Sequence, residues 1–374
     1  MASEPLRFYH RYRRAIETEA IYGEAWLRWA YETPTGRFAT WLVARRPLFS
    51  RYFGWRMSWR AIVRKPWFGP LVALVVVYLF FYAWTPDTMA RPITLITMAR
   101  QTVIVGTAAV GMTLVILLGG IDLSVGSTVA LTTVVSARAL QSGASPVTAV
   151  LVGLGVAAAV GALNGALVVG LQVTPFLVTL GTMSILRGTA KGLADEQKID
   201  CPTQGLEKLM TLGPGREWMI VQPGAWFTLG LAVLVALVLQ FTRFGRHAVA
   251  VGSNERTARL AGVHIGRVKV ITYAAAVLIA GMAGIFELST LTVGDPTDSI
   301  GLELSAIAAV FIGGASPSGG KVSIAGALAG ALLMTVIRTG CQHVGLPNWV
   351  QEILTGTIII VAMGVDRARQ RRAS

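Results

Sequence analysis

The segment with the clearest potential for chemistry spans residues 111–126, GMTLVILLGGIDLSVG, where a single carboxylate interrupts a long apolar run. An unpaired carboxylate among apolar residues is costly, so we expect Asp122 to cap the next helix by accepting the backbone N–H groups of Ser124 and Val125. Asp122 is either a cap alone or a cap that also lines a pathway, and the two roles are compatible. The residues that define this first break are Gly119, Gly120, Asp122, Ser124 and Gly126.

A second glycine-rich break covers residues 312–321, IGGASPSGGK, and follows the run ELSAIAAVF at 303–311. Both breaks read as an apolar run, Gly-Gly, a few residues and another Gly. By our count they follow the second and eighth apolar segments, whereas a five-plus-five repeat would place them after the second and seventh. An internal repeat, common among transporters, therefore stays open. The residues that define this second break are Glu303, Gly313, Gly314, Gly319 and Gly320.

The second break superficially resembles a phosphate-binding loop, but its residues exclude one. The pattern G-x-x-x-x-G-K-[ST] requires glycine and Ser or Thr at the positions of Ala315 and Val322. We find no ATPase signature, so energy for transport must come from a partner or from an ion gradient. The histidines at 10, 247, 264 and 343 and the cysteines at 201 and 341 are scattered. This scatter predicts no metal site, no cofactor and no disulfide framework.

Residues 243–269 form a basic loop, with six Arg or Lys and one Glu, that encodes its own short helix. Asn254 is suited to cap a helix at 255–260 that ends at Gly262, and Glu255 and Arg259 are spaced as an i,i+4 pair. The loop is either a solvated segment or a docking helix for a soluble cytoplasmic subunit. Its candidate residues are Arg246, Gly252, Asn254, Glu255, Arg259 and Gly262.

Membrane-spanning helices are the elements predicted to position these residues. Of the 374 residues 53% are hydrophobic and 14% charged, against about 25% charged in soluble domains. We predict an all-α, polytopic membrane bundle of about ten transmembrane helices, some too short to cross a core of about 30 Å alone. The apolar segments lie at about 68–84, 93–118, 123–139, 147–169, 175–190, 225–240, 270–291, 302–311, 324–341 and 349–363.

The distribution of charge predicts the orientation. The net charge of +14 comes mainly from residues 1–66, the 243–269 loop and the tail at 366–374, whereas the loops at 187–217 and 287–303 have no basic excess. With ten spans and both termini in the cytoplasm, every basic loop lies inside, which explains the charge without a nucleic-acid partner. The predicted parts are a basic extension at 1–66, a transmembrane domain at 67–365 and a basic cytoplasmic tail at 366–374, in the cytoplasmic (inner) membrane.

Four segments resemble the permease family of ribose-type sugar ABC importers. They are GMTLVILLGGIDLSVGS (111–127), VTPFLVTLGTMSILRG (173–188), GRHAVAVGSNERTARLAGV (245–263) and ELSAIAAVFIGGASPSGG (303–320), and the likeness runs from about 68 to 365. The resemblance implies a permease, not an enzyme, that translocates a ribose-type sugar. The partners it implies are a second permease copy, cytoplasmic ATP-binding subunits and a periplasmic sugar-binding protein. It also implies that residues 254–262 couple to the ATPase and that Asp122 and the glycine breaks are pathway signatures.

The N-terminal extension departs from that family's pattern. Residues 16–57 resemble the start of some bacterial phosphatidylserine decarboxylases, but the catalytic domain of those enzymes is absent and no such activity is implied. The extension reads as short basic amphipathic helices on anionic membrane lipid or as a loosely ordered tail. The main alternative function is an ion-coupled secondary transporter of a small polar solute, which would carry carboxylates or His within its spans. Only Asp122 approaches this requirement.

Overall fold

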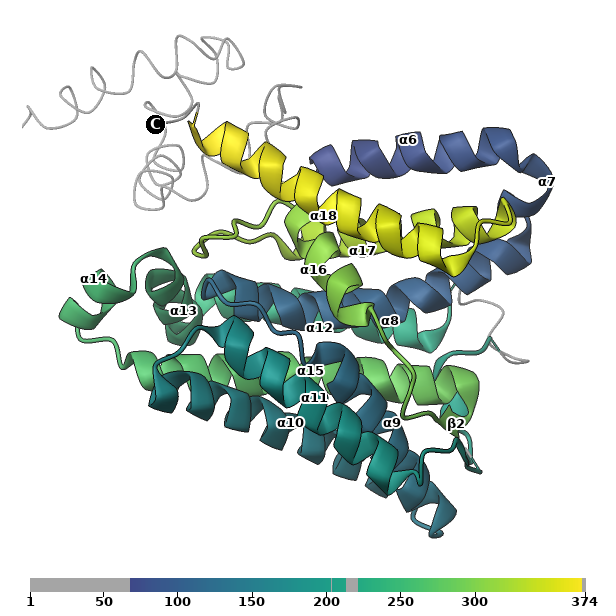
Figure 1. Ribbon diagram of the computed structural model, residues 1–374, viewed down its shortest axis with the longest axis horizontal. Helices are drawn as coiled ribbons and strands as arrows, with labels where there is room; N and C mark the ends of the chain where they lie inside the picture. Colours follow the sequence, from purple (N-terminus) through teal and green to yellow (C-terminus); the bar gives the residue numbers. More distant parts are fainter. Residues whose placement is uncertain (1–67, 203, 213–220, 372–374) are drawn as a thin grey trace, which may run out of the picture. The chain divides into compact units, whose positions relative to one another are not determined.

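A computed structural model describes residues 68–202, 204–212 and 221–371 of the chain. The predicted extension at 1–66 lies outside the described residues. Each of the ten predicted apolar segments coincides with a helix, and short helices connect several of them (Figure 1). The helices are α6 (Phe68–Trp84), α7 (Pro86–Met89), α8 (Pro92–Leu117), α9 (Val125–Gln141), α10 (Pro146–Leu171), α11 (Pro175–Leu193), α12 (Pro223–Phe241), α13 (Arg243–Ser253), α14 (Glu255–Leu260), α15 (Ile265–Leu291), α16 (Leu302–Ile312), α17 (Ile324–His343) and α18 (Asn348–Arg371), with a 3₁₀ turn η1 (Leu206–Leu209).

Proline marks where several of these helices begin. Pro92, Pro146, Pro175 and Pro223 each occupy the first position of a helix, where the missing N–H costs nothing and the fixed φ angle favours the helix. The last helix, α18, continues to Arg371, beyond the predicted segment end at 363. The first residues of the predicted tail therefore belong to a helix.

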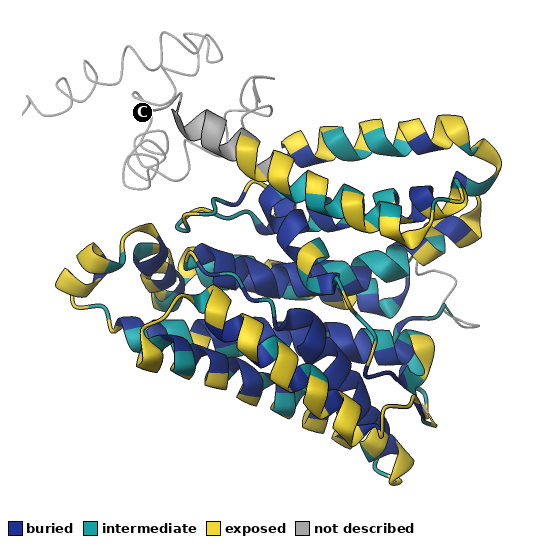
Figure 2. Cartoon of the chain, in the orientation of Figure 1, coloured by how far each residue is buried: buried dark blue, intermediate teal, exposed yellow. Residues whose placement is uncertain are grey.

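The outer surface of the bundle is apolar, as a lipid solvent requires. Five helices, α8, α10, α12, α15 and α17, are each long and apolar enough to cross a membrane, and three shorter apolar helices accompany them. Large apolar side chains such as Leu151, Val233 and Ile353 are more than half exposed. Figure 2 shows this as exposed residues along the outer faces of α10 and α18 and buried residues between the helices. The fold is thus a helical bundle of the membrane class.

Small residues let the central helices approach closely. Gly161 and Gly165 of α10 lie against the backbone of α15 at Tyr273 and Val270, so a side chain at either glycine would collide with it. Gly330 of α17 lies in the same way against Ala309 of α16. The four-residue glycine spacing in the sequence is therefore a packing feature, as in other membrane helices.

The two halves of the bundle share one order of elements. In each half a long helix (α8 or α15) leads into a non-helical segment and then a shorter helix (α9 or α16). The long helix of each half packs against the helix that follows the short one in the other half, α8 against α17 and α15 against α10. The segment at 118–124 therefore corresponds to the segment at 292–301, which follows the seventh apolar segment, rather than to the second glycine-rich break.

A short antiparallel pairing joins two loops at one end of the bundle. Strand β1 (Ile199–Asp200) pairs with β2 (Val293–Gly294), with Ile199 opposite Gly294. The helix α14 lies at the opposite end of the molecule (Figure 1). Among the described residues, these two short strands are the elements that the all-α prediction did not include.

Candidate functional site

The two glycine-rich breaks meet the basic loop at a single place, here called the glycine junction (Leu117–Gly120, Gly252 and Ser318–Gly320). The backbone N–H of Gly320 donates to the carbonyl of Leu117 over 2.9 Å. Gly252 of α13 lies against the same carbonyl and against the Gly320 nitrogen, so even a Cβ at Gly252 would overlap backbone atoms. Leu117, Gly252 and Gly320, which are 135 and 68 positions apart along the chain, therefore form one closely packed junction between α8, α13 and the loop after α16.

Gly319 and Gly320 both adopt positive φ, 81° and 74°, a conformation that glycine reaches without steric cost. Together these two residues turn the chain back toward the end of α8. The other residues of the second break, Gly313 and Gly314, close α16, and Gly313 packs against Gly326 of α17. The sequence predicted both breaks, whereas only the fold shows that they touch.

The predicted helix in the basic loop is present as α14. Asn254 caps it by accepting the N–H of Thr257 over 2.9 Å, and Gly262 follows it with φ of 81°. The ion pair between Glu255 and Arg259 is present at 3.6 Å. Lys269 at the start of α15 also donates to Glu255 over 2.7 Å, a contact that the sequence analysis missed.

The surface of α14 combines charge with an exposed apolar residue. Leu260 at its end is 85% exposed, and the Arg259 side chain is 72% exposed. Arg246 instead contacts the backbone of its own chain, because its guanidinium donates to the carbonyl of Phe241 at the end of α12 over 3.4 Å. Among the candidate loop residues, α14 therefore offers the free surface and α13 connects it to the glycine junction.

Asp122 lies at the centre of a buried polar cluster. It is fully buried, and one of its oxygens accepts the backbone N–H of Ser124 over 2.8 Å and the Ser124 hydroxyl over 2.6 Å. Asn164 of α10, also fully buried, donates to that hydroxyl over 2.9 Å. The predicted bond from the Ser124 N–H is present, but Ser124 itself holds the N-cap position of α9, and no side chain makes a capping bond there. The second predicted donor, Val125, does not donate to Asp122 within the described structure, so the predicted cap is only partly present.

Three polar atoms of this cluster have no hydrogen-bond partner among the described residues: the second carboxylate oxygen of Asp122, the side-chain oxygen of Asn164 and the hydroxyl of Tyr273. Tyr273 belongs to α15 and packs against Gly120. Buried polar groups are almost always paired, so this cluster is a place where a bound water or solute oxygen would be stabilised. Neither Asn164 nor Tyr273 was a predicted site residue.

The starts of α9 and α16 meet inside the bundle. The Glu303 carboxylate in the first turn of α16 lies against Gly126 in the first turn of α9, where a Cβ would overlap it. Gly119, in the first break, lies beside Ser318 in the loop that follows α16. The first turn of α9 is buried, whereas α16 begins beside the exposed residues Ile300 and Leu304, and the positively polarised N-termini of the two helices lie close together.

Neighbouring side chains satisfy the non-helical backbone of the first break. The Thr179 hydroxyl of α11 donates to the carbonyl of Ile121 over 3.1 Å and accepts the N–H of Leu123 over 3.2 Å. Irregular backbone at membrane depth is tolerated only where protein or a cavity provides such partners. The break is therefore a built part of the interior.

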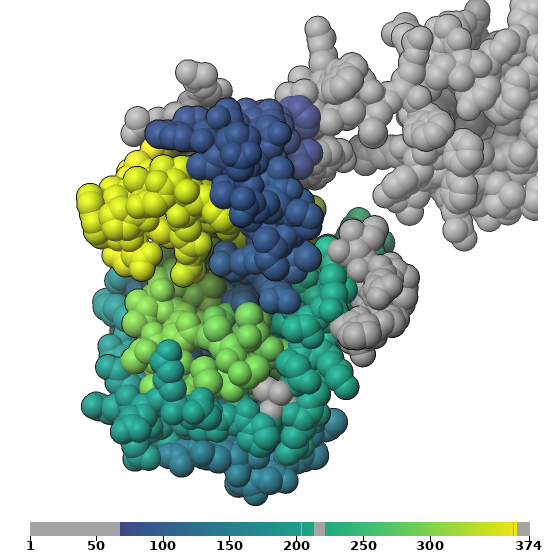
Figure 3. Space-filling view, turned by 90° about the vertical axis from the view of Figure 1, so that its right-hand side faces the viewer, coloured from purple at the N-terminus to yellow at the C-terminus, as the bar shows by residue number. Residues whose placement is uncertain are grey.

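A polar pocket of about 310 Å³ lies where α16 begins. Its charged and amide residues are Gln101 of α8, Glu287 of α15, Asp298 of the loop before α16, and Arg338 of α17. None of them was a predicted site residue, although charged residues within apolar segments are a recognised signal of function. Figure 3 views the end of the molecule near β2, and the segment around residue 300 occupies the middle of that face.

Arg187 of α11 holds the loop that closes this pocket. Its guanidinium donates to the carbonyls of Pro296 and Asp298 over 3.0 and 2.7 Å. At the base of the same loop, burial works against ionisation of Asp295, but hydrogen bonds from Thr297 and from Lys198 outweigh it and hold the pKa of that carboxyl below its usual value. The loop at 295–299 is therefore ordered by specific polar contacts.

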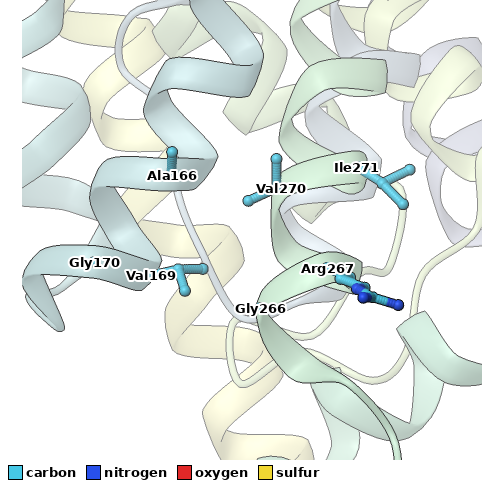
Figure 4. Close-up of a pocket in the computed structure, with 7 residues that line it drawn as sticks. All are labelled: Ala166, Val169, Gly170, Gly266, Arg267, Val270 and Ile271. Atoms are coloured by element: carbon cyan, nitrogen blue, oxygen red, sulfur yellow. The ribbon is translucent and has the colours of Figure 1, made fainter.

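A larger hollow of about 440 Å³ lies between α10 and α15, but its lining argues against a polar ligand. Figure 4 shows Ala166, Val169, Val270 and Ile271 around it, with the Arg267 side chain directed away at one edge. An apolar hollow on the outer face of a membrane bundle is suited to lipid chains. Within the described residues no group of His, Cys, Asp and Glu is arranged to hold a metal ion.

The apolar outer surface, the broken helices and the buried polar interior define a polytopic membrane protein of the transporter class. Residues 94–363 match the family described as the permease component of the branched-chain amino acid transport system. The chain belongs to this family of permeases, which are transport subunits and not enzymes.

Several relatives support the assignment. The chain is 35% identical over 319 residues to the ribose import permease protein of Escherichia coli K12, and the aligned region covers 84% of this chain and 98% of the relative. It is 32% identical to an L-arabinose ABC transporter permease of Azospirillum brasilense, over 84% of this chain and 91% of the relative. It is 33% identical to a fructose import permease of Rhizobium meliloti, over 80% of this chain and 84% of the relative. No solved structure matches the chain.

Proposed function

We propose that the chain is the translocating subunit of an ATP-driven importer for a ribose-type or related monosaccharide. The relatives named for import of ribose, L-arabinose and fructose support sugar as the solute class. The observation that carries the ATP-driven mechanism is α14, a short, capped and exposed helix on the loop that reaches the glycine junction. The chain itself has no phosphate-binding loop, so hydrolysis belongs to a partner.

The proposed topology has ten spans with both termini in the cytoplasm. The basic loop with α13 and α14 and the tail at 366–374 then lie inside, and the paired loops at β1 and β2 lie outside. In this arrangement residues 67–365 form the permease domain and residues 1–66 rest on the inner surface of the membrane. A cysteine near Asp200 or Asp298 should react with an external reagent, whereas one near Asn254 should not. External labelling at Asn254 would contradict the topology.

The proposed partners follow from the two ends of the bundle. Cytoplasmic ATP-binding subunits would bind α14 through Leu260 and Arg259. A periplasmic sugar-binding protein would dock on the opposite end, where β1, β2 and the loop at 295–301 lie. A second permease copy, the same chain or a relative, would complete the pathway, and the basic extension would contact membrane lipid.

The glycine junction suggests how movement is transmitted. A rotation of α13 and α14 would act directly on the end of α8 and on the loop after α16, because Gly252, Leu117 and Gly320 are in backbone contact. Both of these segments lead to the place where α9 and α16 begin. In this proposal Asp122, Ser124 and Gly126 on one side and Glu303 on the other change their separation during transport.

Co-purification tests the class most economically. The tagged full chain, expressed with the ATP-binding protein of its own system, should bring that ATPase through purification in detergent. Replacing the exposed Leu260 with Asp should weaken the association, whereas replacing the lipid-facing Leu151 with Ala should not. An intact, correctly inserted chain that binds no ATPase would contradict the proposal and favour an ion-coupled transporter.

A further inference from the structure

The polar pocket at the start of α16 is built from five parts of the chain. Gln101 comes from α8, Glu287 from α15, Asp298 from the loop before α16, Ser305 from α16 and Arg338 from α17. Its volume of about 310 Å³ lies at the lower end of the range for small-molecule sites, about 300–1,000 Å³. A site of this size suits a compact solute.

Several polar groups of the pocket lack a protein partner. The Oδ2 atom of the Asp298 carboxylate is buried and accepts no hydrogen bond from the described residues. Among the described residues Arg338 forms no hydrogen bond or ion pair. The side-chain oxygen of Gln101 accepts one hydrogen bond, from the Thr339 hydroxyl over 3.4 Å. Such groups are stabilised only when water or a ligand pairs with them. The pocket therefore presents donors and acceptors to whatever occupies it.

The charge of the pocket selects among ligands. Glu287, Asp298 and Arg338 all line it, so carboxyl groups and a guanidinium face the same small space. A solute with a charge of its own would meet a group of like charge there, whereas an uncharged solute with several hydroxyl groups can both donate to the carboxyl groups and accept from the guanidinium.

We propose that this pocket, lined by Gln101, Glu287, Asp298 and Arg338, binds an uncharged polyhydroxyl solute of pentose or hexose size during its passage. The inference rests on the proposed transport function and adds the place and chemistry of binding. The place suits the passage: the pocket lies at the start of α16, whose other end reaches the second glycine-rich break. Movement of that helix would therefore reshape the pocket.

A transport measurement separates this inference from the proposed function. Complexes of the full chain with its ATPase and binding protein, reconstituted in vesicles, are assayed for uptake of labelled D-ribose, L-arabinose and D-fructose. Arg338→Gln and Asp298→Ala should each lower the uptake rate at least about tenfold, the effect of losing one hydrogen bond to a charged group. Arg138→Gln, which removes an exposed guanidinium paired with Asp195, is the matched control and should transport normally.

If the wild-type complex transports a sugar and both pocket variants match it, the pocket assignment is wrong while the transport function stands. If the assembled wild-type complex transports none of the sugars, both fail.

Ligand protection tests occupancy without transport. In the full chain with Cys201 and Cys341 replaced by Ser, Ser305→Cys should react with a small methanethiosulfonate reagent, and D-ribose at millimolar concentration should slow the reaction. Ser142→Cys, an exposed position outside the pocket, should react equally with and without sugar. The family description makes L-leucine the informative competitor. Protection by leucine but by none of the sugars would overturn the inference.

Discussion

Replacing Gly252 with Ala is the sharpest test of the glycine junction. The added Cβ would overlap the carbonyl of Leu117 and crowd the nitrogen of Gly320, and all of these are backbone atoms that no rotamer change can move aside. Overpacking of this kind costs about 1–3 kcal/mol, and separating the two segments also loses the Gly320–Leu117 hydrogen bond, worth about 1 kcal/mol. We therefore expect the variant to lose about 2–4 kcal/mol of stability.

The assay is a thermal unfolding curve of the purified full chain in detergent, together with the amount of ATPase that co-purifies. Gly252→Ala should lower the apparent Tm by several degrees and reduce assembly, because α13 can no longer rest on α8. Gly155→Ala is the control, since a Cβ there meets nothing within 4 Å and alanine favours a helix by about 1 kcal/mol. Wild-type Tm and assembly in Gly252→Ala would refute the junction.

Three further predictions concern charged groups. Glu255→Lys should reduce ATPase assembly because it places a third positive charge beside Arg259 and Lys269, and adding Lys269→Glu should restore stability by reforming the bridge; full assembly of the single variant would count against this reasoning. Asp122→Asn should leave ATPase assembly intact but lower sugar uptake per complex, and unchanged uptake would reduce Asp122 to a cap. Asp295→Asn should lower the Tm at pH 7, and the difference from wild type should disappear as the pH falls below about 4, since a carboxyl with a depressed pKa stabilises the fold only while ionised. A difference that persisted in acid would indicate a cause other than charge.

Much of the architecture could be predicted because lipid imposes a simple rule on sequence. Each span is a continuous apolar run with turn residues or proline at its ends, so all ten segments and the short helix α14 could be located, most of them within a few residues. The start of α15 and the end of α18 lie five and eight residues outside the predicted segments. The cap at Asn254 and the pair Glu255–Arg259 follow from spacing along one helix. Local chemistry of this kind does not depend on the rest of the fold.

The arrangement of the interior could not be predicted in the same way. Whether Gly252 meets Gly320, or Gly126 meets Glu303, depends on how distant helices pack, and helices that are apolar on every side carry little periodic signal about which face is inward. The sequence did contain a signal for the polar pocket, because Arg187, Glu287 and Arg338 are charged residues in or at the ends of apolar segments. Arg187 and Glu287 were assigned to the predicted loops at 187–217 and 287–303, whereas Arg338 lay inside the predicted apolar segment at 324–341.

Reconstitution into vesicles shows directly whether ATP or an ion gradient drives transport by this chain. The purified chain is inserted into vesicles with or without its ATP-binding partner, and uptake of labelled sugar is measured with the binding protein outside and ATP inside. Uptake should occur only when ATPase, ATP and binding protein are all present, and the chain alone should hydrolyse no ATP. Sugar accumulation by the chain alone, driven by a proton or Na⁺ gradient without ATP, would contradict it.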